Sequence, residues 1–286
     1  MLKEFLLRLS VETVHTGKPV QHDKNCIDAK LPPCQARNSL AALLIALGAA
    51  YAGYAVLPGA TLVQSLVQTA VLAAVILGII AWSAPEVLKC AGLGPLRAPA
   101  LWTAGVGLVG GVLLLALHGP VPEFDPVVLL PRIALVLVLC LATGVFEEGL
   151  FRVLLMHALV QYGPFAKHPW LGAALVSSTI FALLHVPLAA LSNIVTLASL
   201  QAMLKLAQTA VFGMIMAGLY AAHRSLWQNS FIHAAFNFCY LGPVYLGLAT
   251  PTTYLPGAFD DFAVLILTLI LLIPPAVTLW RKLVRH

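Results

Sequence analysis

Runs of about 20 apolar residues follow one another along most of this chain, separated by short polar segments. A run of that length is long enough to cross the hydrocarbon core of a bilayer as an α-helix. Eight helices are predicted, at about 39–57, 62–82, 100–118, 128–158, 169–188, 206–222, 228–248 and 262–280. The pattern therefore predicts an all-α fold, a polytopic membrane helix bundle with about eight transmembrane helices.

Two segments, 1–38 and 187–205, depart from this pattern. Residues 1–38 form a polar tail that carries charges of both signs, and the remaining residues, 39–286, are interpreted as one transmembrane helical domain. Within that domain, the segment 187–205 is apolar but broken by polar residues, which favours a partly buried loop or a short helix.

Composition excludes a soluble globular protein. Of the 286 residues, 60% are hydrophobic and 9% are charged, whereas a soluble domain carries about 25% charged residues. The net charge is +5, but its distribution fits membrane topology better than nucleic-acid binding, so we expect a lipid bilayer as partner and no nucleic acid. The five cysteines show no CxxC or CxxH spacing.

The basic residues predict the orientation in the membrane, because cytoplasmic loops carry an excess of Lys and Arg. With the N-terminus in the cytoplasm, most basic residues fall on the cytoplasmic side, and the opposite loops contain only Lys205. The tryptophans agree, since tryptophan prefers the headgroup level and all five fall at helix ends on the cytoplasmic side. We therefore expect an integral, multi-pass membrane protein with both termini cytoplasmic. The basic residues concerned are Lys89, Arg97, Lys167, Arg224, Arg281, Lys282 and Arg285, and the tryptophans are Trp82, Trp102, Trp170, Trp227 and Trp280.

Glu147 and Glu148 are the acidic residues expected at membrane depth, where each charge costs roughly 2.5–3.5 kcal/mol. Arg152 follows Glu148 by four residues, so the two lie on one helical face in the better orientation for an ion pair. Glu147 lies about 100° around the helix and can point into a different space. This leaves Glu147 as a candidate general base.

Two histidines are also expected at membrane depth, His185 and His233. Asn237 follows His233 by four residues, so both can point at one spot. Each residue alone also has a structural interpretation, because buried histidines often bond backbone carbonyls and asparagines often join membrane helices. The functional hypothesis therefore depends on the combination.

The pattern Gly107-x-x-x-Gly111 in the third helix suits close helix packing.

Three motifs on three separate predicted helices make up the combination: Glu147-Glu148-x-x-x-Arg152, Phe181-x-x-x-His185 and His233-x-x-x-Asn237. In order and spacing they resemble the CAAX-protease and bacteriocin-processing family, abbreviated CPBP and also called Abi, which includes CAAX prenyl protease 2. The likeness covers a core at about 128–245.

The resemblance implies a helical core around a water-accessible cavity and an intramembrane endopeptidase activity. The implied substrate is a membrane protein or a lipidated peptide, such as a prenylated or leader-bearing one. The resemblance also implies residue roles. Glu147 activates the hydrolytic water with help from His185, His233 and Asn237 stabilise the oxyanion, and Glu148, Arg152 and Phe181 support the site.

A zinc-dependent version of the protease is an alternative, because Glu147, His185 and His233 could supply three ligands and leave one position open. No HExxH helix is present, and a neutral Asn237 beside His233 suits an oxyanion hole better than a metal site. We therefore favour a site without metal or other cofactor.

Two other function classes stay open. One is a non-proteolytic member of the same superfamily with a bacteriocin-immunity or scaffold role. The other is a proton-coupled transporter, because membrane-embedded carboxylates and histidines also serve as proton relays. Transporters of that kind are often built from inverted repeats, and we find no such repeat in the sequence.

Overall fold

A computed structural model of the chain describes residues 33–57, 59–89, 96–118, 126–165, 167–187, 196–248 and 259–284. Every regular element among these residues is a helix, as predicted. The bundle consists of α2 (Pro33–Val56), α3 (Leu62–Ser83), α4 (Arg97–His118), α5 (Pro126–Glu148), α6 (Met156–Tyr162), α7 (Pro169–Leu184), α8 (Leu197–His223), α9 (Leu226–Tyr245) and α10 (Phe259–Val284), with a short 3-10 helix, η1 (Pro85–Leu88). Most of the 1–38 tail lies outside the described residues.

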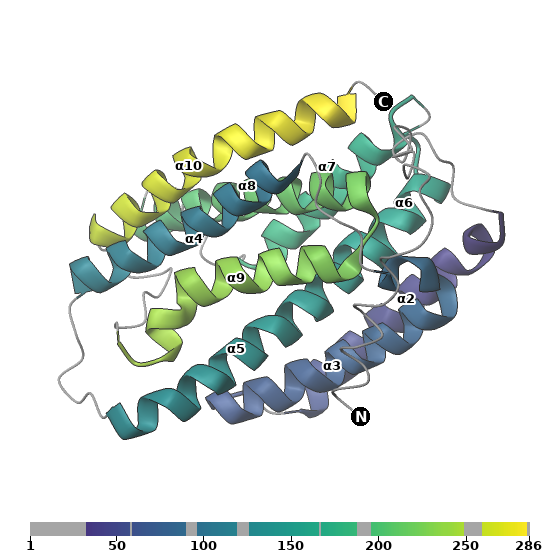
Figure 1. The fold of residues 1–286 in the computed structure, drawn as a ribbon. Coiled ribbons are helices and arrows are strands. Elements are labelled where there is room, and N and C mark those ends of the chain that lie inside the picture. The colour runs from purple at the N-terminus through teal and green to yellow at the C-terminus, as the bar shows by residue number, and fades with distance from the viewer. Residues whose placement is uncertain are drawn as a thin grey trace, which may run out of the picture.

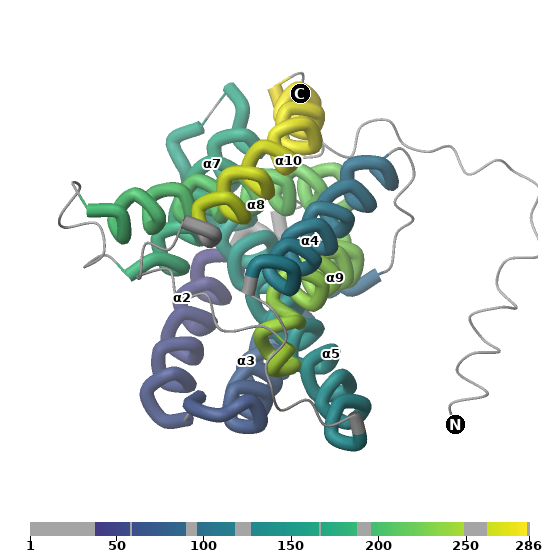
Figure 2. Tube along the Cα trace, turned by 90° about the vertical axis from the view of Figure 1, so that its left-hand side faces the viewer, coloured from purple at the N-terminus to yellow at the C-terminus, as the bar shows by residue number. Residues whose placement is uncertain are grey.

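Helix α9 lies at the centre of the bundle, between α4 on one side and α5 on the other (Figure 1). Helix α3 covers α5 and is itself packed against α2, while α8 lies between α7 and α10. Seen from the side, α2, α3 and α5 form one group of helices and α4, α7, α8 and α10 form a second group (Figure 2). The predicted site residues lie on α5, α7 and α9 and in the segments that directly follow α5 and α7.

Six helices among the described residues are long and apolar enough to cross a membrane, which fits the predicted polytopic bundle. Helix α7 is shorter, with 16 residues. Helix α9 is not among the six and carries polar side chains at Asn229, Ser230, His233 and Asn237. The chain is therefore an integral, multi-pass membrane protein, and its two helices with the weakest membrane signal are two that carry predicted site residues.

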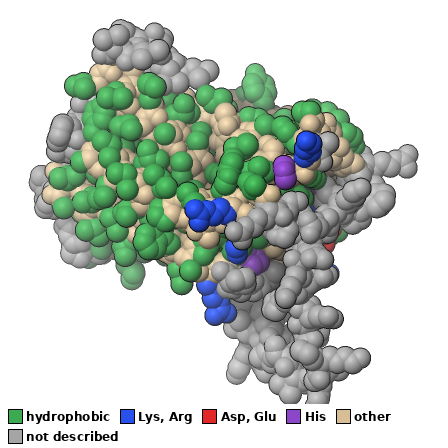
Figure 3. Space-filling model, turned by 90° about the horizontal axis from the view of Figure 1, so that it is seen from above, with side chains coloured by type: hydrophobic (Ala, Val, Ile, Leu, Met, Phe, Trp, Pro, Cys, Tyr) green, Lys and Arg blue, Asp and Glu red, His purple; other side chains and the backbone are tan. Residues whose placement is uncertain are grey.

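The surface agrees with a bilayer environment. Hydrophobic side chains cover much of the face seen in Figure 3, and Lys, Arg and His side chains gather toward the end of the bundle at which α10 ends. The five tryptophans lie close to the ends of α3 and α10 and the starts of α4, α7 and α9. At this end the guanidinium carbon of Arg224 lies 3.4 Å from the centroid of the Trp170 ring, which joins the end of α8 to the start of α7.

The predicted boundaries were wrong in two places. Helix α8 begins at Leu197 rather than near 206, because its first turns bury the polar side chains of Ser199 and Gln201 against the bundle. Lys205 therefore lies inside a helix and not in a loop. Helix α7 ends at Leu184, so His185 occupies the position just after the helix instead of its last turn.

Glycines bring the central helices unusually close together. A side chain at Gly107 would meet the backbone of Phe236, and one at Gly111 would meet the carbonyl oxygen of Cys239, so both glycines of the predicted packing motif face α9. Across the bundle, a Cβ atom at Gly144 would lie 2.6 Å from the carbonyl oxygen of Ser230. The backbone of α9 can therefore contact the backbones of α4 and α5 directly at these glycines. This close approach brings His233 near the two glutamates.

Candidate active site

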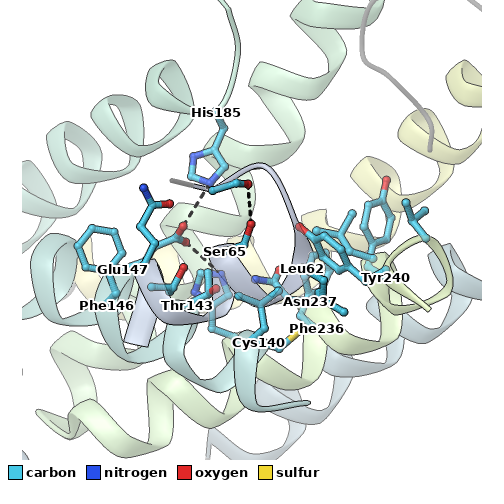
Figure 4. A pocket seen from close by; sticks show the side chains of 18 of the residues that line it. Leu62, Ser65, Cys140, Thr143, Phe146, Glu147, His185, Phe236, Asn237 and Tyr240 are labelled. Atoms are coloured by element: carbon cyan, nitrogen blue, oxygen red, sulfur yellow. Dashed lines mark hydrogen bonds and ion pairs between the residues drawn. The ribbon is translucent and has the colours of Figure 1, made fainter. Parts of the chain in front are cut away.

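A cavity of about 720 Å³ opens between α3, α5, α8 and α9. Five of the predicted site residues line it, and they come from segments far apart in the sequence: Glu147, Phe181, His185, His233 and Asn237. Figure 4 shows Glu147, His185 and Asn237 among its lining side chains. Polar side chains from α3 and α8 complete its wall. Its lining includes Ser65 and Gln68 of α3, Cys140, Thr143 and Glu147 of α5, His185 after α7, Lys205, Gln208 and Phe212 of α8, and His233, Asn237 and Tyr240 of α9.

Glu147 faces this cavity and approaches two histidines. Its Oε1 lies 3.8 Å from Nε2 of His185, and its Oε2 lies 3.4 Å from Nε2 of His233. The Oε2 atom is buried but accepts no hydrogen bond from any described residue. A buried carboxylate oxygen of this kind is normally satisfied, so Glu147 retains an unused hydrogen-bond acceptor beside Nε2 of His233.

Glu148 points the other way and is completely buried. One oxygen accepts a hydrogen bond from Nδ1 of His233 at 2.7 Å, and the other accepts one from Nδ2 of Asn229 at 2.9 Å. Nε of Arg152 lies 3.4 Å from the same Oε2, so the ion pair expected from the spacing is present. The two adjacent carboxylates thus occupy different environments, one in the cavity and one inside the protein.

Arg152 is as buried as its partner. Its guanidinium carbon lies 4.6 Å from the ring centroid of Phe181 and 5.8 Å from that of Phe151, and its nitrogens make no hydrogen bond with described residues. The cation is therefore held by the charge of Glu148 and by aromatic faces, an arrangement known to stabilise guanidinium groups. Phe181, a motif residue without an obvious chemical role, is one of these faces.

The helix changes its winding directly after Glu148. Residues Gly149–Leu155, called η3, form a π-helical segment between α5 and α6, although the sequence pattern predicted one uninterrupted helix. The hydroxyl of Ser177 on α7 donates a hydrogen bond to the carbonyl oxygen of Phe151 at 2.9 Å. Segments of this type are rare and occur frequently at functional sites. Here the segment carries Arg152.

His185 is oriented by the backbone of its own helix. Its Nδ1 bonds the carbonyl oxygen of Phe181 at 2.7 Å, and its ring lies against the Phe181 ring with centroids 4.2 Å apart. Because a carbonyl oxygen can only accept, Nδ1 carries the proton. In the neutral ring Nε2 is therefore an acceptor, and it is the atom that faces Glu147.

His233 lies between the two carboxylates, with Nδ1 bonded to Glu148 and Nε2 toward Glu147. The ring is 2% exposed and packs edge-on against Phe212 at a centroid distance of 5.0 Å. Asn237, one helical turn further along α9, lines the same cavity. The two side chains thus reach a common space, as their spacing predicts.

Sequence reasoning missed Asn229, which bonds both Glu148 and the carbonyl oxygen of Met216. Its spacing could have indicated it, because Asn229, His233 and Asn237 form an i, i+4, i+8 stripe on α9. It also missed Lys205 and Gln208, which line the cavity but had been assigned to a loop and to a helix start without chemical interest.

The three side chains considered as zinc ligands, Glu147, His185 and His233, all line the cavity. Among the residues that the structure describes, no three His, Cys, Asp or Glu side chains are grouped so that they could hold a metal ion. One nitrogen of His233 is engaged by Glu148, and its other nitrogen and that of His185 approach different oxygens of Glu147.

Comparison with known families adds a separate line of evidence. Residues 129–239 match the family described as type II CAAX prenyl endopeptidase Rce1-like. The comparisons with curated proteins and with solved structures found no match. The matched segment runs from α5 into α9 and contains Glu147, His185, His233 and Asn237, together with the buried partners Glu148 and Arg152. Over this segment the chain is similar to the type II CAAX prenyl endopeptidase family, and the match supports the resemblance to the CAAX-protease and bacteriocin-processing family that its three motifs indicate.

Proposed function

We propose that this protein is an active intramembrane endopeptidase in which Glu147 serves as the general base. The observation that carries the proposal is the position of Glu147 in the cavity, 3.8 Å from Nε2 of His185 and 3.4 Å from Nε2 of His233. A carboxylate flanked by two imidazoles in a cavity at membrane depth has the groups that hydrolysis of a peptide bond requires.

The gap between Glu147 and His185 suits a water molecule. Their facing atoms are too far apart for a direct hydrogen bond, and a water about 2.8 Å from each would donate one hydrogen to the carboxylate and one to Nε2. Both hydrogens of that water are then engaged, so a lone pair of its oxygen is available to attack a carbonyl carbon.

Hydrolysis then needs two proton transfers. Glu147 takes a proton from the water as its oxygen bonds the carbonyl carbon, which gives a tetrahedral intermediate with a negative oxygen. When the C–N bond breaks, the same carboxyl group delivers the proton to the leaving amine. The products are a carboxylic acid and an amine, Glu147 returns to its ionised form, and the acid then passes its proton to the amine to give a carboxylate and an ammonium group.

His233 and Asn237 supply donors for the negative oxygen. Glu148 accepts a hydrogen bond from Nδ1 of His233 and so orients the ring with Nε2 toward the cavity, where an Nε2–H would donate to the negative oxygen. The side-chain amide of Asn237 is a second donor on the same helical face. Donors held in place before the reaction stabilise the intermediate without reorganising, and the buried pair Glu148–Arg152 with Phe181 holds His233 in place.

The proposed substrate is a membrane protein or a lipidated peptide, in keeping with a cavity enclosed by membrane helices. We further propose that the protein is oriented with both termini in the cytoplasm, because most basic side chains fall on one side of the predicted topology. The proposed mechanism uses no metal ion.

The test compares wild type with Glu147→Gln in proteoliposomes, read by mass spectrometry of membrane proteins and lipidated peptides for new cleavage products. Glu86→Gln, an exposed glutamate in η1, is the matched control. We expect cleavage to disappear in the Glu147 variant alone while both variants elute as folded protein. A Glu147→Gln variant that cleaves at the wild-type rate would refute the proposal. Unchanged cellular phenotype without cleavage would favour a scaffold or immunity role instead.

A further inference from the structure

Asn229 is a buried amide on α9 that precedes His233 by one helical turn and lies outside the three motifs of the site. Its side chain is 2% exposed. Its Nδ2 atom donates two hydrogen bonds, one to Oε2 of Glu148 at 2.9 Å and one to the carbonyl oxygen of Met216 on α8 at 2.8 Å. Asn229 therefore joins α9 to both α5 and α8 directly beside the site.

The two acceptors fix which end of the Asn229 amide faces Glu148. The carbonyl oxygen of Met216 can only accept a hydrogen bond, so the nitrogen of Asn229, and not its oxygen, must lie toward it. The second hydrogen on the same nitrogen then points at Oε2 of Glu148, which accepts it. An aspartate at this position would have the same shape but would place an acceptor against two acceptors.

The same oxygen of Glu148 has a second neighbour, Arg152. Nε of Arg152 lies 3.4 Å from Oε2, whereas a charge-assisted hydrogen bond between such groups is normally about 2.7–2.9 Å long. The guanidinium nitrogens of Arg152 make no hydrogen bond with any described residue, so a carboxylate without another partner would move toward them. The bond from Asn229 keeps Oε2 on the side of α9, and Oε1 then lies 2.7 Å from Nδ1 of His233.

We propose that Asn229 is a positioning residue, which keeps the Glu148 carboxylate away from Arg152 and thereby orients His233 toward the oxyanion. Asn229 does not line the cavity, so it acts only through Glu148 and His233. The proposal rests on the proposed function for the oxyanion, but the hydrogen bond of His233 can be observed without any cleavage.

The test compares Asn229→Ala, Asn229→Ser and Asn229→Asp with the wild type. Cleavage of a fluorescence-quenched peptide with an S-farnesylated cysteine gives kcat and KM in proteoliposomes, and thermal unfolding in detergent gives Tm. Ser39→Ala is the matched control, because the Ser39 hydroxyl also donates a hydrogen bond between helices, to Gln161 of α6, but outside the cavity lining.

We expect kcat to fall at least about tenfold in Asn229→Ala, because a hydrogen bond to a charged group is lost, while KM changes little. Tm should fall no further than in Ser39→Ala, since Arg152 can then approach Glu148 more closely. Asn229→Ser keeps one donor and should lie between the wild type and Asn229→Ala, and Asn229→Asp should be the least active.

A wild-type kcat in folded Asn229→Ala would overturn the inference, and so would an Asn229→Asp variant that is more active than Asn229→Ala. If Asn229→Ala does not fold, Asn229→Ser decides in its place, and a wild-type kcat there has the same consequence.

A double-mutant cycle on kcat shows whether Asn229 acts through Glu148. In the Glu148→Gln background the carboxylate that Asn229 positions is absent, so the further change Asn229→Ala should lower kcat by less than about twofold. A second loss of the full size would mean that Asn229 acts on another group, and it would overturn the inference.

NMR of protein with isotope-labelled histidine observes His233 itself, on the Glu147→Gln background. The Nδ1–H signal of His233 should shift toward that of a free imidazole in Asn229→Ala but not in Ser39→Ala. An unchanged signal would overturn the inference and leave Glu147 as the proposed base. A shifted signal in a protein whose wild-type form cleaves no peptide would refute the proposed function and leave the positioning of His233 by Asn229 standing.

Discussion

Replacing Glu148 by glutamine tests whether the buried ion pair both stabilises the protein and supports the chemistry. The substitution keeps the shape of the side chain but removes the charge opposite Arg152, whose side chain is 0% exposed and whose nitrogens have no hydrogen-bond partner among described residues. Removing one member of a buried pair costs about 3–5 kcal/mol. For a chain of this size that loss lowers Tm by about 6–20 °C.

A double-mutant cycle separates the pair from its surroundings. Arg152→Met should cost a similar amount, because Glu148 then keeps only the hydrogen bonds from His233 and Asn229. In Glu148→Gln/Arg152→Met neither charge is left unpaired, so the two costs should not add and the coupling should reach about 2–3 kcal/mol. Thermal unfolding in detergent, followed by size-exclusion chromatography, measures all four proteins.

Activity should not follow stability in this cycle. The double variant regains much of its Tm, but Nδ1 of His233 faces a neutral amide instead of a carboxylate, so the charge-assisted hydrogen bond that orients the ring is lost. We therefore expect kcat to remain low in the double variant while KM changes little. Additive losses of stability would refute the direct pairing of Glu148 with Arg152. Full activity in the stable double variant would refute the role of Glu148 in holding His233.

Three further predictions concern packing, the oxyanion and metal. Gly144→Ala should lower both Tm and kcat, because its Cβ would lie 2.6 Å from the carbonyl oxygen of Ser230, whereas Gly78→Ala, which points into open space, should be neutral in the same assays. Asn237→Ala should reduce kcat about 10²–10³-fold without a comparable change in Tm; equal activity would remove it from the oxyanion site. Activity should persist in EDTA and purified protein should contain no stoichiometric zinc by elemental analysis, and loss of activity that zinc restores would contradict the proposed mechanism.

Local patterns in the sequence predicted the features of the fold that depend on local spacing. The apolar runs indicated the helices, the i, i+4 spacing of Glu148 and Arg152 indicated their ion pair, and Gly107-x-x-x-Gly111 indicated close packing, which occurs against α9. In each case the residues that form the pattern lie within one continuous stretch of the sequence. Which helix would be the partner was not predictable from spacing.

Features that depend on tertiary contacts were not predictable in the same way. The first turns of α8 bury Ser199 and Gln201. The end of the apolar but interrupted segment 187–205, for which a loop or a short helix was expected, therefore belongs to a long helix, and Lys205 lies within it. The π-helical segment after Glu148 has no known signature in residue spacing, and Ser177 of another helix bonds a carbonyl oxygen within it. Asn229 gains its role only through the approach of α9 to α5, which Gly144 permits.

The imidazole of His233 connects the two adjacent glutamates and accounts for how both can lie at membrane depth. Consecutive residues on a helix point about 100° apart, so Glu147 and Glu148 cannot both contact the same atom of a partner. His233 contacts them with different nitrogens: Nδ1 lies 2.7 Å from Oε1 of Glu148, and Nε2 lies 3.4 Å from Oε2 of Glu147. Arg152 balances the charge of Glu148, while Glu147 faces the cavity with Nε2 of His233 beside it. In the proposed mechanism Glu147 becomes neutral when it takes a proton from water, and the His233 ring that contacts both carboxylates then lies close to the developing oxyanion, where it is placed to stabilise the intermediate.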